Sequence, residues 1–425
     1  MTESIVPHGP VNPATPLVPA RGDARFSRLV VTRLLERLRD ATLVVTDDHG
    51  EHRYGAGAPE IHVRINDPRV YSSLLRSGAS GFGETYVDGW WDCDDLTNLV
   101  RVVVSNMSWI SGHLDRWARA TAPLLTPLRA LSGTDKVKDR ENIRAHYDLS
   151  NDFFELMLDE TMSYSCAFFD DPSVSLADAS RAKLDRICRK LDLGPNDHLI
   201  EIGTGWGGLA IHAASKYGCR VTTTTISDAQ FDYATRRVAD AGLADRVDVR
   251  NQDYRDLTGV YDKLVSVEMI EAIGWRQLDT FFSTCASLLR PEGVMGLQAI
   301  VIDDRSYERA KRSEDFIKRQ IFPGGFLPSI EAMIHSMTST TDLRVLDVED
   351  IGRHYAETLS RWRENLIVHA EAVEQLNLGE RFHRLWDLYL SYCEGAFLER
   401  HISDVQMILA RDGWRGPLGA MTARA

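Results

Sequence analysis

A glycine-rich segment at 201–208 carries the clearest chemical signal in the chain. It follows a short apolar stretch, 199–202, and precedes a helical pattern at 209–217. Glycine lets the backbone turn tightly and approach a ligand, and a helix N-terminus offers free N–H groups to it. A dinucleotide would suit this pattern as well, but the acidic residue in front of the glycines favours S-adenosylmethionine. We expect the cofactor to contact Glu201, Gly203, Gly205 and Gly207.

Further candidate contacts follow the next two predicted strands, 221–226 and 247–250. A nucleotide-binding fold reads the ribose near the end of its second strand, and Asp253 is placed to accept a hydrogen bond from an adenine amino group. Asp228 and Asp253 could instead cap helices or turns, as aspartate often does. From these segments we expect the cofactor to contact Thr225, Ile226, Ser227, Gln230, Asp253 and Tyr254.

The elements that must position these residues alternate regularly from about 196 onward. Strand patterns fall at 199–202, 221–226, 247–250, 263–267 and 293–301, and helical patterns at 209–217, 229–241 and 277–289. Such alternation predicts an α/β fold, a doubly wound and mostly parallel sheet with helices on both faces. Beyond 303 we expect a helical elaboration that includes 355–370 and 382–409.

The N-terminal third has a different pattern. Residues 1–22 are rich in proline and predict a disordered leader. Residues 23–105 predict a small α+β accessory domain with a helix at 26–40 and an extended segment at 51–65. Residues 106–140, punctuated by prolines, predict a helical linker whose clearest part is 109–138. The catalytic domain would then span 141–425.

Composition excludes several classes of protein. The 425 residues carry a net charge of −13, which disfavours a nucleic-acid partner because phosphate contacts need a positive surface. No apolar run is long enough to cross a membrane. The six cysteines form no CxxC pair, so we expect neither a metal site nor a disulfide framework, and a reducing cytoplasm is the natural location.

Several distinctive segments accompany the glycine loop in a fixed order. They lie at 83–92, 145–154, 164–169, 269–274 and 321–329. Together these segments resemble the cyclopropane-fatty-acyl-phospholipid synthases and the mycolic-acid cyclopropane synthases, over roughly residues 80–410. The resemblance implies a Rossmann-like class I methyltransferase domain.

The same resemblance implies a reaction. The cis double bond of an acyl chain in a membrane phospholipid would attack the methyl group of S-adenosylmethionine, and the resulting carbocation would lose a proton to give a cyclopropane. An isolated olefin is a poor nucleophile, so the site should align it and exclude water. Aromatic faces would stabilise the cation, and the candidates, for which core packing is the alternative, are Tyr164, Phe168, Phe169, Phe322 and Phe326.

Site residues also follow from the resemblance. Bicarbonate is implied as the base, held by Cys166, Glu271, Tyr355 and the backbone near Ile300, while Glu271 could itself serve as base. No histidine stands at a matching position beside Cys166, so we do not expect this thiol to be a nucleophile. Tyr164 and Ser165 are expected beside the cofactor.

Two positions depart from the best-known members of that family. Gln298 replaces a histidine and cannot carry a proton or a positive charge, and Glu268 stands in place of a glycine. The alternative product is therefore a 10-methylene chain, which a separate reductase would convert to a 10-methyl chain.

Access to a lipid substrate calls for peripheral contact with the inner face of the cell membrane, which a homodimer would strengthen. Basic residues that could serve are Arg25, Arg28, Arg33, Arg37 and Arg39, and Lys311, Arg312, Lys318 and Arg319, although ordinary solvated helix faces would look the same. Competing functions are a catalytically silent lipid-binding protein, a nicotinamide-dependent oxidoreductase and a small-molecule methyltransferase.

Overall fold

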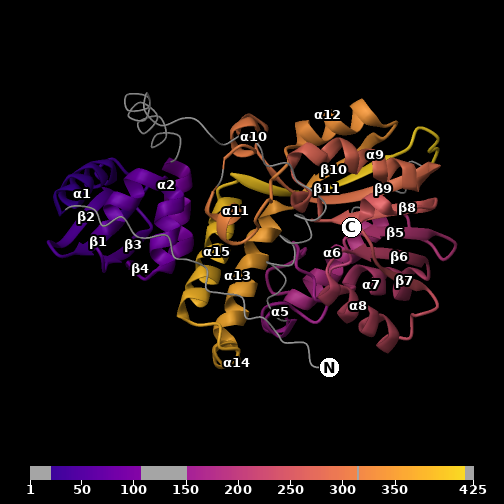
Figure 1. Ribbon diagram of the computed structural model, residues 1–425, viewed down its shortest axis with the longest axis horizontal. Helices are drawn as coiled ribbons and strands as arrows, with labels where there is room; N and C mark the ends of the chain where they lie inside the picture. The colour runs from indigo at the N-terminus through magenta and orange to yellow at the C-terminus, as the bar shows by residue number, and fades with distance from the viewer. Residues whose placement is uncertain (1–20, 107–150, 314, 417–425) are drawn as a thin grey trace, which may run out of the picture.

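Two separate sheets organise the chain. The computed structural model describes residues 21–106, 151–313 and 315–416. A four-stranded sheet formed within residues 41–93 lies at one side of the molecule and a seven-stranded sheet at the opposite side, with a group of helices between them (Figure 1). Residues 1–20 of the leader predicted at 1–22 and residues 107–140 of the linker predicted at 106–140 fall outside the described residues, whereas residues 21 and 22 begin a helix.

The N-terminal unit is a small α+β structure. Its sheet has the order β2-β1-β3-β4, and its core is centred on Trp91, which is fully buried and stacks on Phe82 at a centroid distance of 4.1 Å. The helix predicted at 26–40 is shifted towards the N-terminus, and the extended segment predicted at 51–65 is two strands. The elements are α1 (Arg21–Leu35), β1 (Ala41–Asp47), β2 (Gly50–Ala56), β3 (Glu60–Ile65), α2 (Arg69–Val87) and β4 (Trp91–Cys93).

The large sheet confirms the predicted α/β fold. Its order is β10-β11-β9-β8-β5-β6-β7, and the five strands from β9 to β7 run parallel. These strands are short and rich in β-branched residues, which suit a sheet that is buried on both faces. Their bounds are β5 (His198–Ile202), β6 (Arg220–Thr225), β7 (Val247–Asn251), β8 (Tyr261–Val267) and β9 (Leu289–Ile302).

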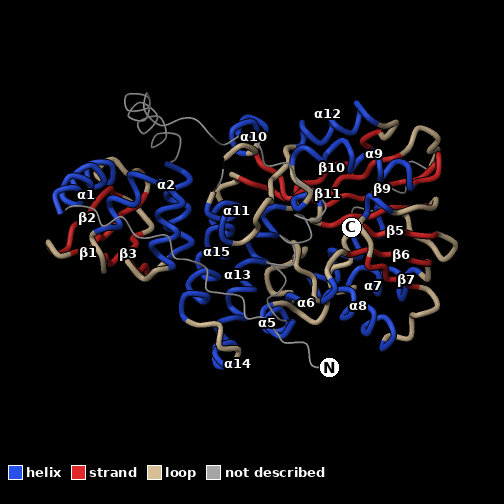
Figure 2. Tube along the Cα trace, viewed as in Figure 1, coloured by secondary structure: helices blue, strands red, loops and turns tan. Residues whose placement is uncertain are grey.

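Helices cover both faces of this sheet (Figure 2). One hydrophobic cluster joins the sheet to α6, α7 and α8, and another joins it to α9 and α12. The bounds are α6 (Leu176–Lys190), α7 (Gly208–Tyr217), α8 (Asp228–Asp240), α9 (Leu278–Leu288), α10 (Asp304–Ala310), α11 (Phe316–Gln320) and α12 (Ile330–Thr340). Short 3₁₀ turns are η2 (Tyr254–Asp256), η3 (Ile270–Ala272) and η4 (Trp275–Gln277).

The prediction of a helix over 382–409 is wrong in its second half. Helix α15 (Glu380–Leu398) ends where Arg400 takes a left-handed backbone conformation with φ 54°, and the chain returns as strand β11 (Ile402–Ala410). Residues 404–410 are all buried because β11 inserts antiparallel between β9 and a second missed strand, β10 (Arg344–Asp350). A strand covered on both faces loses the alternation of polar and apolar residues, so its sequence resembles a buried helix.

A helical layer separates the two sheets (Figure 1). The N-terminal unit packs on α15, where Arg384 donates to Asp92 Oδ1 at 2.9 Å and to the carbonyl oxygen of Tyr86 at 2.6 Å. In the described part of the chain, no helix is long and apolar enough to cross a membrane. The layer consists of α5 (Asn151–Met157), α13 (Gly352–Val368), α14 (Ala370–Gln375) and α15.

Candidate functional site

A cavity opens at the carboxyl ends of β5, β6 and β8, where a doubly wound sheet binds its ligand. The glycine loop after β5 forms one of its walls. Gly203 has φ 99° and Gly205 has φ 52°, conformations that side chains rarely allow. A Cβ atom on Gly203 would lie 3.0 Å from the Cβ of Met269. The left-handed backbone therefore favours glycine at both positions, and at 203 the close approach of Met269 also leaves little room for a side chain.

Most of the residues predicted to bind the cofactor line this cavity. The lining includes both segments that follow β6 and β7, so the glycine loop and these segments lie together although they are far apart in the sequence. The members are Tyr164, Ser165, Glu201, Gly203, Gly205, Thr225, Ile226, Gln230, Asp253 and Tyr254.

Three of the residues considered earlier have local structural roles instead. Gly207, with φ 87°, is the residue before α7, and Ser227 caps α8 by accepting a hydrogen bond from the backbone N–H of Gln230 at 3.3 Å. Neither lines the cavity, and neither does Asp228, which accepts from the Asn251 amide at 2.6 Å. Asp253 combines two roles, because it lines the cavity and also caps η2 while pairing with Arg255 at 2.7 Å.

Glu201 is a buried carboxyl group at the end of β5. It accepts a hydrogen bond of 2.6 Å from the Thr223 hydroxyl. Burial raises its pKa to about 8, and the Thr223 bond and the positive charge of Lys183 oppose the rise. Glu201 therefore presents a polar wall that is largely uncharged at neutral pH.

Lys183 is a site residue that sequence reasoning missed. It lies on α6, is 1% exposed, lines the cavity and donates to the Ser165 hydroxyl at 2.7 Å. Burial lowers its pKa, and the nearby Glu268 opposes that change. A signal did exist, because Lys183 occupies an apolar position of the helix beside Leu184 and Ile187, where a lysine is rarely buried without a partner.

Glu268 lies at the centre of the site. It follows β8, lines the cavity, and its carboxylate accepts three hydrogen bonds, from the Cys166 backbone N–H at 2.8 Å, the Gln298 amide at 2.8 Å and the Tyr355 hydroxyl at 2.6 Å. Its backbone has φ 50°, a left-handed conformation that costs a side-chain-bearing residue about 1–2 kcal/mol. A strained non-glycine residue with three donors on its carboxylate is typical of a functional position.

The implied bicarbonate site does not fit this arrangement. The Cys166 N–H and the Tyr355 hydroxyl, two of its donors, are directed at Glu268, and Gln298, at the position of the family's histidine, is directed there too. A further donor, the backbone N–H of Ile300, is bound to Glu271 Oε1 at 2.6 Å. The chain's own carboxylates thus take the donors that the resemblance assigns to an external anion.

Glu271 is a buried carboxyl group on the 3₁₀ turn η3. Burial raises its pKa to about 8, and the negative charge of Glu268 adds to the rise. Its Oε2 has no hydrogen-bond partner among the described residues. Glu271 is not among the residues that line the cavity, so Glu268 is the better placed of the two to meet a substrate.

Cys166 and Tyr355 both donate hydrogen bonds to the Glu268 carboxylate. The Cys166 thiol is fully buried, donates to the Ala167 carbonyl oxygen at 3.2 Å, and has its pKa raised well above the usual value by burial and by the neighbouring Asp404. A thiol with a raised pKa is a poor nucleophile. Burial also raises the pKa of Tyr355, which therefore stays a hydrogen-bond donor.

The aromatic candidates divide between the site and the core. Tyr164 lines the cavity, packs on Trp362 at 5.2 Å and shares a hydrogen bond of 2.9 Å with Tyr389, against which Phe322 also packs. The other three belong to packing elsewhere: Phe168 contacts the Arg186 guanidinium, Phe169 lies in a small separate cluster, and Phe326 lies in the core under α9 and α12.

Comparison with known proteins adds an independent line of evidence. The mycolic acid cyclopropane synthetase family matches residues 134–407. The chain is 37% identical to the tuberculostearic acid methyltransferase UfaA1 of Mycobacterium tuberculosis, over 94% of this chain and 95% of that protein. It is 36% identical to the cyclopropane-fatty-acyl-phospholipid synthase of Escherichia coli K12, over 84% and 89%.

A solved structure extends the likeness to three dimensions. The mycolic acid cyclopropane synthase CmaA1, crystallised with SAH and CTAB, matches with a TM-score of 0.56 at 31% identity, covering 64% of this chain and 98% of that one.

Proposed function

From the premise that this chain belongs to the mycolic acid cyclopropane synthetase family and is an S-adenosylmethionine-dependent methyltransferase, we propose that it methylates the cis double bond of an unsaturated acyl chain in a membrane phospholipid. We propose further that Glu268 accepts the proton that the lipid cation then loses. The two relatives whose names state a lipid product, UfaA1 and the Escherichia coli synthase, support the substrate class.

The cavity suits the cofactor on its own features. The backbone turn at Gly203 and Gly205 leaves room that a Cβ would fill, and Asp253 and Glu201 offer oxygen acceptors at separate points of the wall. When bound, S-adenosylmethionine supplies an electrophilic methyl group on a sulfonium centre. The residues of the chain hold that group, exclude water and receive the proton.

The observation that carries the proposal is the set of three hydrogen bonds on Glu268. Those bonds hold the carboxylate in one orientation beside the cofactor cavity. A general base must lie within hydrogen-bond reach of the proton that it removes, and this requirement comes before any requirement on its pKa. Burial raises the pKa of Glu268, which makes it a better proton acceptor than an exposed carboxylate.

The product that we favour is the methylene branch. The π electrons of the double bond form the new C–C bond to the methyl group, leaving a cation on the other vinyl carbon. A hydride shift moves the cation to the methylated carbon, and loss of a methyl proton to Glu268 places the C–H electron pair in a new C=CH₂ bond. The tuberculostearic acid name of the relative that aligns over 94% of the chain supports this route.

A cyclopropane is the second candidate, supported by the name of the Escherichia coli relative. Without the hydride shift, loss of the same methyl proton closes a ring instead. Both products differ from the substrate by the mass of one CH₂ group, and only the branch has a double bond for a separate reductase to remove.

Aromatic side chains near the cavity fit a cationic intermediate. Tyr355 stacks on Phe397 at 4.6 Å and packs on Trp362 at 6.1 Å, and Trp362 in turn contacts Tyr164. Ring faces present negative potential without a lone pair that would trap the cation. These rings also exclude water, whose attack would divert the product to an alcohol.

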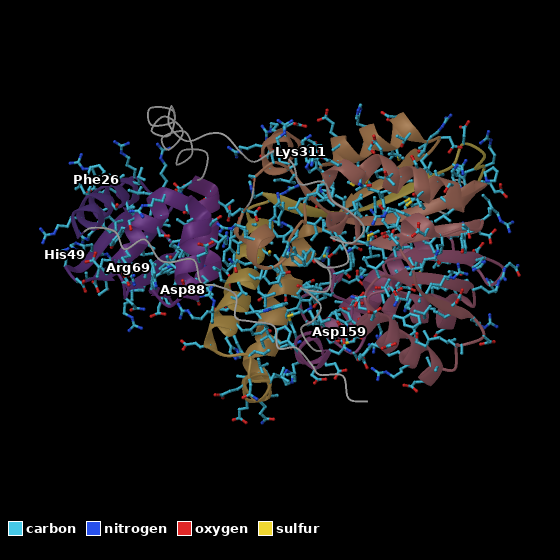
Figure 3. All side chains as sticks on the ribbon, in the orientation of Figure 1. Phe26, His49, Arg69, Asp88, Asp159 and Lys311 are labelled. Carbon is cyan, nitrogen blue, oxygen red and sulfur yellow. The ribbon has the colours of Figure 1, made fainter. Side chains whose placement is uncertain are left out.

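The substrate lies in a bilayer, so we propose a docking surface on α1. Phe26 and Leu29 are 54% and 52% exposed there, and Arg25 and Arg33 are exposed on the same helix. Phe26 lies on the outer part of the N-terminal unit, away from the large sheet (Figure 3). The second basic group is less suitable, because Lys311 and Arg312 pair with Glu308 and Arg319 pairs with Glu84.

The test uses purified protein, S-adenosylmethionine and vesicles of oleoyl phospholipid that carry deuterium on both vinyl carbons. Mass spectrometry should show the gain of one CH₂ group, and NMR should show an exocyclic C=CH₂ with both deuterium atoms on one neighbouring carbon. A ring that keeps one deuterium on each carbon would support the cyclopropane instead. No mass gain on any cis-unsaturated phospholipid would refute the proposed function.

A further inference from the structure

A second buried carboxyl group lies directly behind Glu268. Asp404, on β11, is 0% exposed, and its Oδ2 accepts a hydrogen bond of 2.9 Å from the Gln298 amide nitrogen. The other proton of that nitrogen points to Glu268 Oε1 at 2.8 Å. One amide group therefore bridges two acidic side chains from different strands.

The orientation of Gln298 is determined by its surroundings. Its Oε1 accepts from the Gln406 amide at 3.1 Å, which leaves the nitrogen for the carboxyl groups. Gln406 faces Gln298 in the β11–β9 register, and Asp404 lies two residues earlier on the same face of β11. The backbone N–H of Glu268 also donates to the Gln298 carbonyl oxygen at 2.9 Å. The end of β8 and the strands β9 and β11 thus hold four side chains in one hydrogen-bonded row, which consists of Glu268, Gln298, Asp404 and Gln406.

The two carboxyl groups cannot both be charged at low cost. Like charges in a buried site oppose each other, so such a pair retains one proton. Burial together with the negative charge of Glu268 raises the pKa of Asp404 well above its usual value. The charged or titratable groups that face the pair are Lys183 from α6, Cys166, Glu271 from η3 and Tyr355 from α13.

One atom of Asp404 shows that the row is incomplete as a hydrogen-bond network. Its Oδ1 has no hydrogen-bond partner among the described residues, although it is fully buried. A buried acceptor without a donor costs about 1–3 kcal/mol, and a buried charge without a partner costs more. A protonated Asp404 carries no charge and leaves the pair with a single negative charge beside the positive charge of Lys183.

We propose that Asp404 is a positioning residue of the deprotonation step: it shares one proton with Glu268, so that the pair, and not Glu268 alone, takes up the methyl proton from the lipid cation. This inference rests on the proposed function. Asp404 does not line the cofactor cavity, so it acts through Glu268. The proton leaves carbon for Glu268 while its C–H electrons form the new double bond, and the pair passes from singly charged to neutral.

The principal experiment compares the rate of product formation against pH in the wild type, in Asp404→Asn and in the control Asp347→Asn. Asp347 is a carboxylate of the neighbouring strand β10 that pairs with Lys190 at 2.8 Å, outside the row. The proton that Asp404 shares stabilises the charged Glu268 carboxylate, so removing it should raise the apparent pKa of Glu268, and the acid limb of the profile should move to higher pH by roughly one unit. The limb should not move in Asp347→Asn.

A purely structural role would reduce the rate of Asp404→Asn without moving the limb, and that result would overturn the inference. The wild type must form product in the same assay. If it forms none, the proposed function fails first, and the two failures are distinguishable.

A second measurement uses the wild type alone, in case Asp404→Asn does not fold. Infrared spectra of protein labelled with carbon-13 in its aspartate carboxyl groups should contain a protonated-carboxyl band at neutral pH that shifts with the label. Absence of any label-sensitive band of this kind between about pH 6 and 8, where ordinary aspartates are charged, would refute the shared proton.

Discussion

The hydroxyl of Tyr355 donates a hydrogen bond of 2.6 Å to Glu268 Oε2 across 87 residues of sequence. Tyr355 comes from α13 in the helical layer, whereas Glu268 follows β8 of the large sheet. This bond joins the wall of the cofactor cavity to the aromatic cluster around Trp362. The position of the proposed base therefore depends on the packing of the helical layer against the sheet.

Replacing Glu268 by Gln should abolish most product formation while leaving cofactor binding intact. A positioned general base contributes roughly 100- to 10,000-fold to a rate, and the amide cannot take up a proton. The rate is measured with oleoyl phospholipid and the affinity by calorimetry. The control is Glu292→Gln, an exposed residue of β9, and a full rate in Glu268→Gln would contradict the assigned role.

The Glu268→Gly variant tests the same site in a different way. Glycine relieves the strain of φ 50° and leaves the Cys166, Gln298 and Tyr355 donors without an acceptor. Added bicarbonate or formate should therefore raise the rate of Glu268→Gly, and the wild-type rate should not depend on either anion. A rate of Glu268→Gly that stays low at every anion concentration would argue against the Glu268 carboxylate as the group that takes up the proton.

Gly203→Ala should weaken cofactor binding by about tenfold or more. The added Cβ would lie 3.0 Å from Met269 Cβ, and the backbone at φ 99° costs a side-chain-bearing residue about 1–2 kcal/mol. The control is Gly242→Ala, where φ is 67° but nothing lies within 4 Å. Both variants should lose stability in urea titrations, and only Gly203→Ala should lose affinity for S-adenosylmethionine.

Stability should fall as pH rises, in part because of Glu201. Burial raises its folded-state pKa to about 8, against about 4.3 in the unfolded chain, so between these values the folded state binds the extra proton. The contribution is complete below the lower value and is lost as pH rises through the higher one. Glu201→Gln should reduce the slope of unfolding free energy against pH by up to about 1.4 kcal/mol per unit, measured in urea between about pH 5 and 8. An unchanged slope would show that Glu201 is charged in the folded protein.

Replacing Phe26 and Leu29 together by Ser should weaken binding to anionic phospholipid vesicles by at least about tenfold, because inserting each apolar side chain contributes on the order of 1.5 kcal/mol or more. The measurement is sedimentation with vesicles of oleoyl phosphatidylglycerol. Val260→Ser, which alters a residue 58% exposed before β8, is the control. Equal binding by both variants would exclude α1 as the docking surface.

Local patterns in the chain are enough to predict much of this protein. The glycine loop and the β-branched stretch of β6 predict the parallel sheet and the cofactor cavity, because a strand, a tight turn and a helix N-terminus are adjacent in sequence. Ten of the twelve predicted cofactor contacts line that cavity. Gly207 and Ser227 do not line it. Each lies next to a lining residue in the sequence, but Gly207 is the residue before α7 and Ser227 caps α8.

Other features depend on contacts between distant segments. Residues 404–410 of strand β11 are all buried, so polar and apolar residues do not alternate along it and its sequence does not distinguish it from a buried helix. Four buried polar residues of the site come from four different elements: Lys183 from α6, Glu268 from the end of β8, Gln298 from β9 and Asp404 from β11. Their contacts with one another form only when the sheet and α6 are assembled, so the role of each is not predictable from its own segment. In the sequence, Glu268 is only a departure from a family pattern. In the folded chain its carboxylate accepts three hydrogen bonds, because the tertiary structure brings the donors of Cys166, Gln298 and Tyr355 to it.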